Sequence, residues 1–264
     1  MAFDLVRYEL ADHVATIALN RPEQRNALNP EAYRQLEAGF RQAQSDPEVR
    51  CVLITGTDPS FCSGDDVKEI MAGPARETTV ASLRQVRPRA TPAAIAVLEC
   101  DRPVIAAVNG PAVGWGMDLT LFCDIRIASE RARFGELFIK RGLVSDIGGL
   151  QRLPQIVGPS KAAELLFTGD VIDAKEAERI GLVSQVVPHE SLLTTARGLA
   201  AKIAANPPLA LRYLKEGLRR AQLADPHELG AWVSQTLGIL FQTEDHREGV
   251  RSFLEKRAPV FKGK

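Results

Sequence analysis

The sequence has few of the residues that hold a metal ion or form disulfide bonds. Of its 264 residues only four are cysteine and four are histidine, and no two cysteines form a C-x-x-C pair. A structural zinc site needs four cysteine or histidine ligands at matching spacings, which this sequence does not supply. We therefore expect no metal site, and reduced thiols in the core at Cys51, Cys62, Cys100 and Cys123.

The sequence also lacks an excess of charge of either sign. Its 33 basic and 33 acidic side chains give a formal net charge of +0, whereas proteins that bind nucleic acids or anionic membranes usually carry clustered Lys and Arg. No run approaches the roughly 20 apolar residues of a membrane span. The first residues, MAFDLVRYEL, contain acids and no apolar segment after a basic start, unlike a signal or transit peptide. These absences predict a cytoplasmic protein with a small-molecule ligand, and neither a nucleic acid nor a membrane as partner.

Hydrophobic residues, at 45% of the chain, are numerous enough to build a substantial core, and 25% of the residues are charged. This balance is typical of a soluble globular protein, and a chain of this length often forms one large α/β domain. The β-branched segment His13–Asn20 predicts a strand. Asn29, followed by proline and glutamate, predicts the start of a helix that runs to about Ser45.

Two later segments repeat the order of buried strand, glycine-containing turn and helix. Cys51–Gly56 and Pro103–Gly110 are short apolar runs, which favours strands inside a parallel sheet. The helices that follow are expected to begin near Gly64 and to cover Gly114–Phe122. Between the two units, residues 73–99 carry scattered prolines and arginines, and we expect mobile helices there.

From Gly158 onward the pattern becomes helical. Asp173–Glu176 has the form of a capping box, and a last helix is expected over Glu244–Lys256. The sequence therefore predicts an α/β core over residues 1–200 and a C-terminal helical region over residues 201–264.

The two turns, Ser60–Asp66 and Asn109–Gly116, place glycines where helices are expected to begin. Backbone N–H groups at a helix start have no partner inside the helix, so two such turns side by side can bind an anionic oxygen, as an oxyanion hole does. The alternative is that the glycines only permit tight turns. A dinucleotide fingerprint does not fit, because Leu119 stands at its third glycine position. The four histidines lie in contexts that indicate no catalytic triad.

Several motifs in a fixed order resemble those of the enoyl-CoA hydratase/isomerase (crotonase) superfamily. They extend over nearly the whole chain, at Arg21–Leu28, Phe61–Asp66, Asn109–Gly116, Cys123–Ala128, Gly148–Pro154, Gly181–Ser184 and Arg247–Arg257. The resemblance implies an α/β crotonase-like fold of repeated β-β-α units, with a C-terminal helical region that forms a homotrimer or homohexamer. It further implies an acyl-CoA thioester substrate whose carbonyl oxygen lies in the oxyanion hole, and no cofactor apart from the CoA of the substrate.

By position in these motifs, the resemblance assigns the backbone N–H groups of Asp65 and Trp115 to the oxyanion hole. The superfamily usually has glycine or a small residue at both positions. Because backbone groups do the donating, we expect the hole to persist. The side chain of Trp115 is expected to narrow the acyl pocket or to offer it a stacking face.

Carboxylates near the second turn are the candidates for proton transfer. Asp118 lies three residues after Trp115 on the same helix face and matches the first catalytic carboxylate of the superfamily, although it would also favour the helix dipole. The second hydratase acid is replaced by Phe138, which cannot activate water. Asp146 matches the position of the acid in double-bond isomerases of the superfamily. The pair Asp118 and Asp146 therefore resembles the pair of acids in dienoyl-CoA isomerases. Those enzymes have a further acid at the position of Phe138. Glu136 either replaces the missing acid or is a surface or structural acid.

Five residues match superfamily positions that contact CoA: Arg25, Ala27, Ser63, Phe253 and Lys256. The guanidinium of Arg25 suits the CoA phosphates. Phe253 and Lys256 match residues that reach the CoA of a neighbouring subunit, although an amphipathic last helix in ordinary packing has the same pattern.

Two further aspartates are given structural roles only. We expect Asp66 to cap a helix, and Asp124 to pair with nearby backbone or with Arg126.

Isomerisation of a carbon–carbon double bond in an enoyl-CoA or dienoyl-CoA is the reaction that the sequence favours. The two amides would stabilise the enolate, while Asp118 and Asp146 share removal and return of the proton. One alternative is hydration of a trans-2-enoyl-CoA. Another is a protein that binds CoA esters with little turnover.

Overall fold

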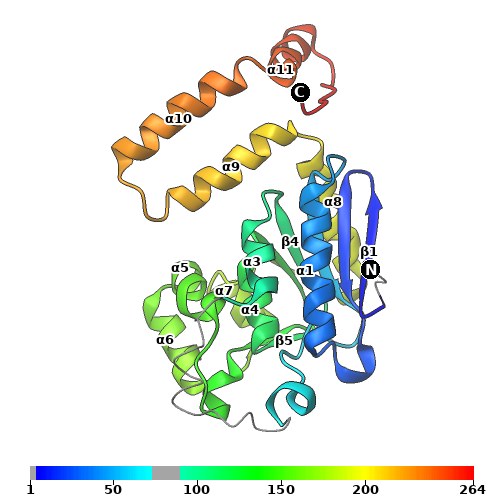
Figure 1. The fold of residues 1–264 in the computed structure, drawn as a ribbon, viewed down its shortest axis with the longest axis vertical. Helices are drawn as coiled ribbons and strands as arrows, with labels where there is room; N and C mark the ends of the chain where they lie inside the picture. Colours follow the sequence, from blue (N-terminus) through cyan, green and yellow to red (C-terminus); the bar gives the residue numbers. More distant parts are fainter. Residues whose placement is uncertain (1–3, 73–89) are drawn as a thin grey trace, which may run out of the picture.

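A computed structural model describes residues 4–72 and 90–264 (Figure 1). Mobile helices were expected over residues 73–99. Residues 73–89 lie outside the described range, and Pro92–Glu99 forms a helix. Within the described residues, nine strands form one sheet of six, in the order β1-β2-β3-β4-β6-β9, and one of three, in the order β5-β7-β8. The strands are β1 (Val6–Ala11), β2 (Val14–Leu19), β3 (Cys51–Gly56), β4 (Val104–Val108), β5 (Pro111–Val113), β6 (Ile125–Ser129), β7 (Arg133–Gly135), β8 (Ile172–Asp173) and β9 (Gln185–Val187).

The described helices are α1 (Pro30–Ser45), α3 (Pro92–Glu99), α4 (Trp115–Phe122), α5 (Leu153–Val157), α6 (Pro159–Thr168), α7 (Ala174–Arg179), α8 (Leu192–Ala204), α9 (Pro208–Arg220), α10 (Pro226–Leu240) and α11 (Glu244–Glu255). Short 3-10 turns are η1 (Pro22–Gln24), η3 (Leu137–Arg141) and η5 (His189–Ser191), and π-helical turns are η2 (Val67–Met71) and η4 (Gly148–Arg152).

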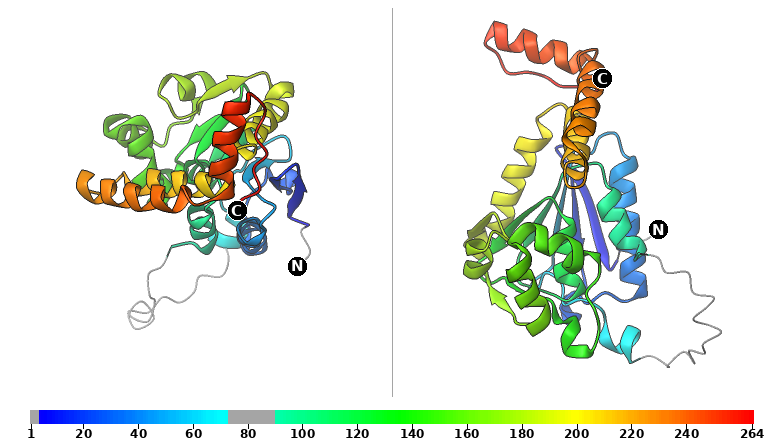
Figure 2. Two further views of the ribbon diagram at one scale, coloured as in Figure 1. Left: turned by 90° about the horizontal axis from the view of Figure 1, so that it is seen from above. Right: turned by 90° about the vertical axis from the view of Figure 1, so that its left-hand side faces the viewer.

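Helices cover both faces of the large sheet, as Figure 2 shows. Successive side chains of a strand point to opposite faces, so Val52 and Ile54 of β3 join the core beneath α1, whereas Leu53 joins the smaller core beneath α8. A strand buried on both faces must be apolar throughout. The continuous apolar run from which β3 was predicted therefore reflects its central place, and β3 pairs in parallel with β2 and β4.

Local sequence signals explain where several elements begin. The side chain of Asn29 accepts a hydrogen bond from Ala32 N at 2.9 Å, which confirms the predicted start of α1. Asp173 caps α7 in the same way, and Asp66 accepts from the first amides of η2. All four cysteines are free and buried, as predicted.

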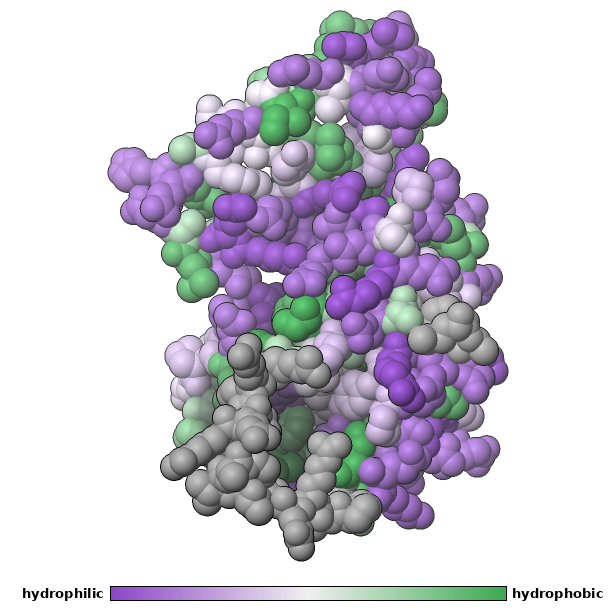
Figure 3. Space-filling model, viewed as in Figure 1, coloured by the Kyte–Doolittle hydropathy of each residue, from purple (hydrophilic) through white to green (hydrophobic). Residues whose placement is uncertain are grey.

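Helices α9, α10 and α11 extend beyond the sheet at one end of the molecule (Figure 1). The expected boundary after residue 200 falls within α8, whose Ala200 and Ala204 pack against the sheet, so the projecting part begins at α9. An apolar groove of about 450 Å³ lies between α9 and α10. The face seen in Figure 3 is mainly hydrophilic, with separate hydrophobic patches.

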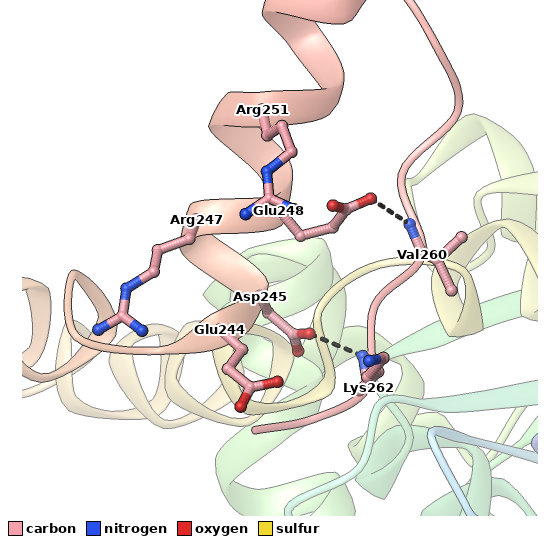
Figure 4. Close-up of a pocket in the computed structure, with 7 residues that line it drawn as sticks. All are labelled: Glu244, Asp245, Arg247, Glu248, Arg251, Val260 and Lys262. Atoms are coloured by element: carbon pink, nitrogen blue, oxygen red, sulfur yellow. Dashed lines mark hydrogen bonds between the residues drawn. The ribbon is translucent and has the colours of Figure 1, made fainter.

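The C-terminal tail folds back onto α11, beside a cavity of about 280 Å³. Glu248 accepts a hydrogen bond from Val260 N at 3.0 Å, and Asp245 accepts one from Lys262 N at 2.7 Å (Figure 4).

Within residues 4–72 and 90–264, none of the helices has the length and apolar character needed to cross a bilayer.

The buried Lys215 fixes α9 to the core. Its ammonium donates to the carbonyl oxygen of Arg102 at 2.7 Å and pairs with Asp124 at 2.6 Å. Asp124 also accepts from Val104 N, which confirms the structural pairing with nearby backbone that was one of its two expected roles. Arg126 donates to three backbone carbonyls, because it is enclosed by the ends of α4 and α7.

Replacing Lys215 by methionine should lower the free energy of unfolding by about 2 kcal/mol, because Asp124 would keep its partly buried charge without a cation. Chemical denaturation measures this change. Lys175→Met, at an exposed site on α7, is the control and should have little effect. Equal stability of the two variants would contradict the role given to Lys215.

Candidate active site

The two glycine-containing turns lie directly against each other. Cys62 N donates to Pro111 O, and Val113 N donates back to Cys62 O, each at 3.0 Å. Gly64 has a φ of +86°, and a Cβ atom there would lie 3.2 Å from Trp115 N. Glycine is therefore needed at this position both for its backbone conformation and for the close approach to the first residue of α4.

Two amides at this contact are unpaired. Within the described residues, neither Asp65 N nor Trp115 N donates a hydrogen bond, although Asp66 N bonds to Leu28 O and Asp118 N bonds to Gly114 O. Asp65 and Trp115 both line a cavity of about 20 Å³, which has room for about one water molecule. The arrangement is the one expected of an oxyanion hole, and its role stays a prediction.

Asp118 is fully buried on α4, with 0% of its surface exposed. Its Oδ1 accepts from Gly149 N at 2.6 Å and from Ser145 Oγ at 3.4 Å. Its Oδ2 has no hydrogen-bond partner in the described structure. Burial, reinforced by the nearby charge of Asp146, raises the pKa of Asp118 to about 7. Such a carboxyl group can both take and give a proton near neutral pH.

Asp146 is held by donors from three parts of the chain. Its Oδ2 accepts from Trp115 Nε1 at 2.9 Å and from Thr91 Oγ1 at 3.0 Å, and its Oδ1 accepts from Ile147 N at 2.7 Å. Its charge contributes to the raised pKa of Asp118. The structure thus brings together the two aspartates that the sequence proposed as a pair.

The side chain of Trp115 does not offer a stacking face. It is buried, with edge-to-face contacts to Tyr33 at 4.8 Å and Phe122 at 6.0 Å between ring centroids. The Tyr33 hydroxyl donates to Asp65 Oδ1 at 2.7 Å, and burial raises the pKa of Asp65. The two residues that depart from the superfamily pattern therefore join the contacts around the cavity, and the indole N–H of Trp115 binds Asp146.

Glu136 is a buried acid, 1% exposed, so its interpretation as a surface acid is wrong. Its Oε2 accepts from Ser145 Oγ at 3.2 Å, and its Oε1 has no partner in the described structure. Burial and the neighbouring Asp118 raise the pKa of Glu136 to about 9. Phe138 lines the small cavity, whereas Glu136 is not among its lining residues.

Three of the five predicted CoA-contacting residues lie together beside the cavity. Ser63 N donates to Arg25 O at 3.1 Å, and Ala27 N donates to Gln24 O in the same turn. Ser63 lines the cavity, and Arg25 is exposed to solvent. Their contacts with CoA stay predictions.

The other two, Phe253 and Lys256, are not brought to this site within one chain. They lie at the end of α11, which Figure 1 shows at the opposite end of the molecule from η2. The side chain of Phe253 is 81% exposed. This position leaves them free to meet a neighbouring subunit, as the resemblance implies.

A Ser-His-Asp series of hydrogen bonds occurs elsewhere, although the sequence indicated none. Ser129 Oγ lies 3.1 Å from His189 Nδ1, and His189 Nε2 lies 3.1 Å from Asp58 Oδ2. Ser129 is fully buried, and its Oγ accepts from Arg131 N. A buried hydroxyl that already caps a turn is not a nucleophile for a bound substrate, so the series has a structural role.

No group of three or more His, Cys, Asp or Glu side chains in residues 4–72 and 90–264 is placed to hold a metal ion. The two buried acids Asp118 and Glu136 both contact the hydroxyl of Ser145. The further hydrogen bond to Asp118 Oδ1 comes from a backbone amide, Gly149 N.

The raised pKa of Asp118 predicts a pH-dependent effect on stability. The folded chain retains a proton that the unfolded chain loses near pH 3.8, so this carboxyl lowers the free energy of unfolding as the pH rises from about 4 to about 7. Asp118→Asn removes the ionisation, and above pH 7 the variant should be more stable than the wild type by on the order of 4 kcal/mol.

Denaturation at pH 4 and pH 8 measures the difference, with Asp170→Asn as an exposed control. A difference between wild type and Asp118→Asn that does not change with pH would show that Asp118 ionises normally.

Comparisons with known proteins agree with this fold and show the family to which the chain belongs. Residues 9–264 match the model of the family described as enoyl-CoA hydratase/isomerase. Among curated relatives, the chain is 39% identical to (E)-benzylidenesuccinyl-CoA hydratase of Thauera aromatica, covering 98% of this chain and 99% of that protein. It is 36% identical to crotonyl-CoA hydratase of Syntrophomonas wolfei, covering 99% of both.

Among solved structures, enoyl-CoA hydratase from Bacillus anthracis superposes with a TM-score of 0.87 and 35% identity, covering 98% of this chain and 100% of that one. The expected crotonase-like fold is therefore confirmed. By sequence and by fold, this chain belongs to the enoyl-CoA hydratase/isomerase family.

Proposed function

We propose that this enzyme moves a proton within an unsaturated acyl-CoA thioester, with migration of a carbon–carbon double bond as the net reaction. The observation that carries the proposal is the free Oδ2 of the buried Asp118 in the first turn of α4, the helix that begins with Trp115, whose amide is unpaired like that of Asp65. The aromatic Phe138 favours isomerisation over water addition, because it places an apolar ring in the cavity where a hydratase of the family has its second acid.

The oxyanion hole makes the substrate acidic. In the proposed complex the thioester oxygen accepts hydrogen bonds from Asp65 N and Trp115 N, which stabilise the enolate that forms when a proton leaves carbon. The unpaired amides are held in place by the packing of Gly64 against the start of α4. They donate without reorganisation at the moment of reaction.

The carboxylates transfer the proton. Asp118, whose pKa burial raises to about 7, removes a proton from the α- or γ-carbon through its free Oδ2. The same proton is returned at the other end of the allylic system, either by Asp118 itself or by Asp146, which takes it over from Asp118 and is oriented by Trp115 and Thr91. Arg25, Ala27 and Ser63 bind the CoA portion, while Phe253 and Lys256 bind the CoA of a neighbouring subunit.

Hydration of a 2-enoyl-CoA is the second candidate, and the names of the relatives favour it. Both curated relatives described above are called hydratases. In this reaction Asp118 would act on water together with Asp146 or Glu136.

A panel of enoyl-CoA and dienoyl-CoA substrates separates the two reactions, because hydration adds the mass of one water whereas isomerisation leaves the mass unchanged and shifts the absorbance. We expect isomerised products to dominate, which would support double-bond migration. Faster water addition than double-bond migration on every substrate would overturn it in favour of hydration. Binding without either product would identify a CoA-ester-binding protein.

Replacing Asp118 or Asp146 by asparagine should lower kcat by roughly a hundredfold or more in each case. Asparagine keeps the shape of the aspartate side chain but is not a base. The CoA ester should still bind, which calorimetry can measure. Full activity of Asp146→Asn with an inactive Asp118→Asn would leave a mechanism with one base. Asp170→Asn again serves as the exposed control.

The chain is further proposed to assemble as a trimer or as a dimer of trimers, with a second copy covering the apolar groove between α9 and α10. Leu214 and Leu218 line that groove and are well exposed in the single chain. Apolar surface gathered on two projecting helices favours association.

Light scattering at micromolar concentration should give the mass of three or six chains, and Leu218→Glu should reduce that mass. Phe167→Glu alters a similarly exposed side chain on α6 and is the control. A monomeric wild type would contradict the assembly.

A further inference from the structure

Glu136 is the buried acid to which the proposed reaction gives no role. It follows β7 directly and meets Asp118 through one side chain, that of Ser145. The serine Oγ lies 3.2 Å from Glu136 Oε2 and 3.4 Å from Asp118 Oδ1.

A serine hydroxyl carries only one proton to donate. The Oγ also lies 3.2 Å from the backbone oxygen of Asp146, which can only accept. If both acids were ionised, the single serine proton would face three acceptors, and at least one acid would be held against a second acceptor. When one acid is protonated and donates to Ser145 Oγ, the serine proton remains for the other acid and the Asp146 oxygen. The geometry therefore places an extra proton on Glu136 or on Asp118.

The surroundings decide which acid holds that proton. Asp118 Oδ1 accepts a second, short bond from Gly149 N at 2.6 Å, which stabilises a carboxylate. In the described structure Ser145 is the only hydrogen-bond partner of Glu136, and neither acid forms an ion pair with a Lys, Arg or His side chain there. Glu136 is thus the acid that gains more from staying neutral, in agreement with its more strongly raised pKa.

The packing leaves this cluster little freedom to rearrange. A Cβ atom on Gly149 would lie 2.0 Å from Ser145 Oγ, and one on Gly148 would lie 2.3 Å from Asp118 Oδ1. Because the backbone of η4 closes over the acids, their contacts with Ser145 are fixed by the fold.

We propose that Glu136 is a positioning residue: as a neutral acid it donates to Ser145, whose own proton is thereby available to Asp118 Oδ1, shared with the backbone oxygen of Asp146, so that Asp118 keeps its Oδ2 free for the substrate. This inference rests on the proposed role of Asp118 and adds a residue to it. Neither Glu136 nor Asp118 lines the small cavity, but Asp118 shares α4 with Trp115, whereas Glu136 meets Asp118 only through Ser145. Ionisation of Glu136 at alkaline pH reverses the direction of the Ser145 proton and withdraws that donor from Asp118.

The kinetic test compares Glu136→Gln and Glu136→Leu. The amide of Gln donates to Ser145 Oγ as a neutral carboxyl does, so kcat at pH 7 should stay within about threefold of the wild type, and the alkaline change of kcat should disappear. Leu cannot donate, and kcat should fall by at least about tenfold with KM little changed. In a Ser145→Ala background the same Leu substitution should have little further effect.

Two kinetic outcomes overturn the inference. If Glu136→Gln is as inactive as Asp118→Asn, Glu136 transfers a proton itself. If Glu136→Leu keeps the rate and pH profile of the wild type, the contact with Ser145 has no role.

Infrared spectroscopy tests the proton independently of turnover, so it still decides the matter if no substrate is converted. At pH 8, above the pKa of Asp118 at about 7 and below that of Glu136 at about 9, the wild type should show the carbonyl band of a protonated, buried carboxylic acid, largely lost in Glu136→Gln and retained in Asp118→Asn. Glu130→Gln, at an exposed site, should leave the band in place. A band lost in Asp118→Asn and retained in Glu136→Gln would place the proton on Asp118 and overturn the inference.

Discussion

The contact between Gly64 and the first residue of α4 is the constraint on which the rest of the site depends. It exists because β3 and β4 are parallel neighbours, so that the turns at their carboxyl ends meet at one edge of the sheet. A side chain at Gly64 would separate the turns and the two amides with them. The departures from the superfamily at Asp65 and Trp115 leave this backbone geometry intact, since their side chains extend into neighbouring contacts.

The second feature that shapes the site is the burial of acids without nearby cations. Two carboxyl groups in a water-poor interior cannot both ionise at low cost, and their pKa values are pushed upward. Asp118 is thereby brought to the range in which a carboxyl group both accepts and donates protons. The same shift lowers the free energy of unfolding above neutral pH. Such a loss of stability is common at sites where activity requires strained or unfavourable groups.

Much of the fold could be predicted from the sequence, because local patterns encode it. The apolar run Cys51–Gly56 indicated a buried parallel strand, and Asn29 marked the start of α1. The site was predictable only in part. Helical spacing placed Asp118 near the second turn. Nothing local indicates that Tyr33 would donate to Asp65 or Thr91 to Asp146, because Tyr33 and Thr91 come from distant segments that carry no motif.

Side-chain orientation was the least predictable property. The indole of Trp115 was expected to narrow the pocket or to present a face to it, but Tyr33 and Phe122 hold it edge-on and direct its N–H to Asp146. Glu136 was left open between a surface and a functional acid, because burial of an acid depends on which loops close over it. Here the backbone at Gly148 and Gly149 does so.

The most direct test of the central claim, that two amides and Asp118 together make a thioester α-carbon acidic, is exchange of the α-protons of an acyl-CoA in deuterated water, followed by mass spectrometry. The wild type should incorporate deuterium, and Asp118→Asn should bind the same ester without incorporating it. Equal incorporation by the variant, or none by a wild type that binds the ester, would contradict the account.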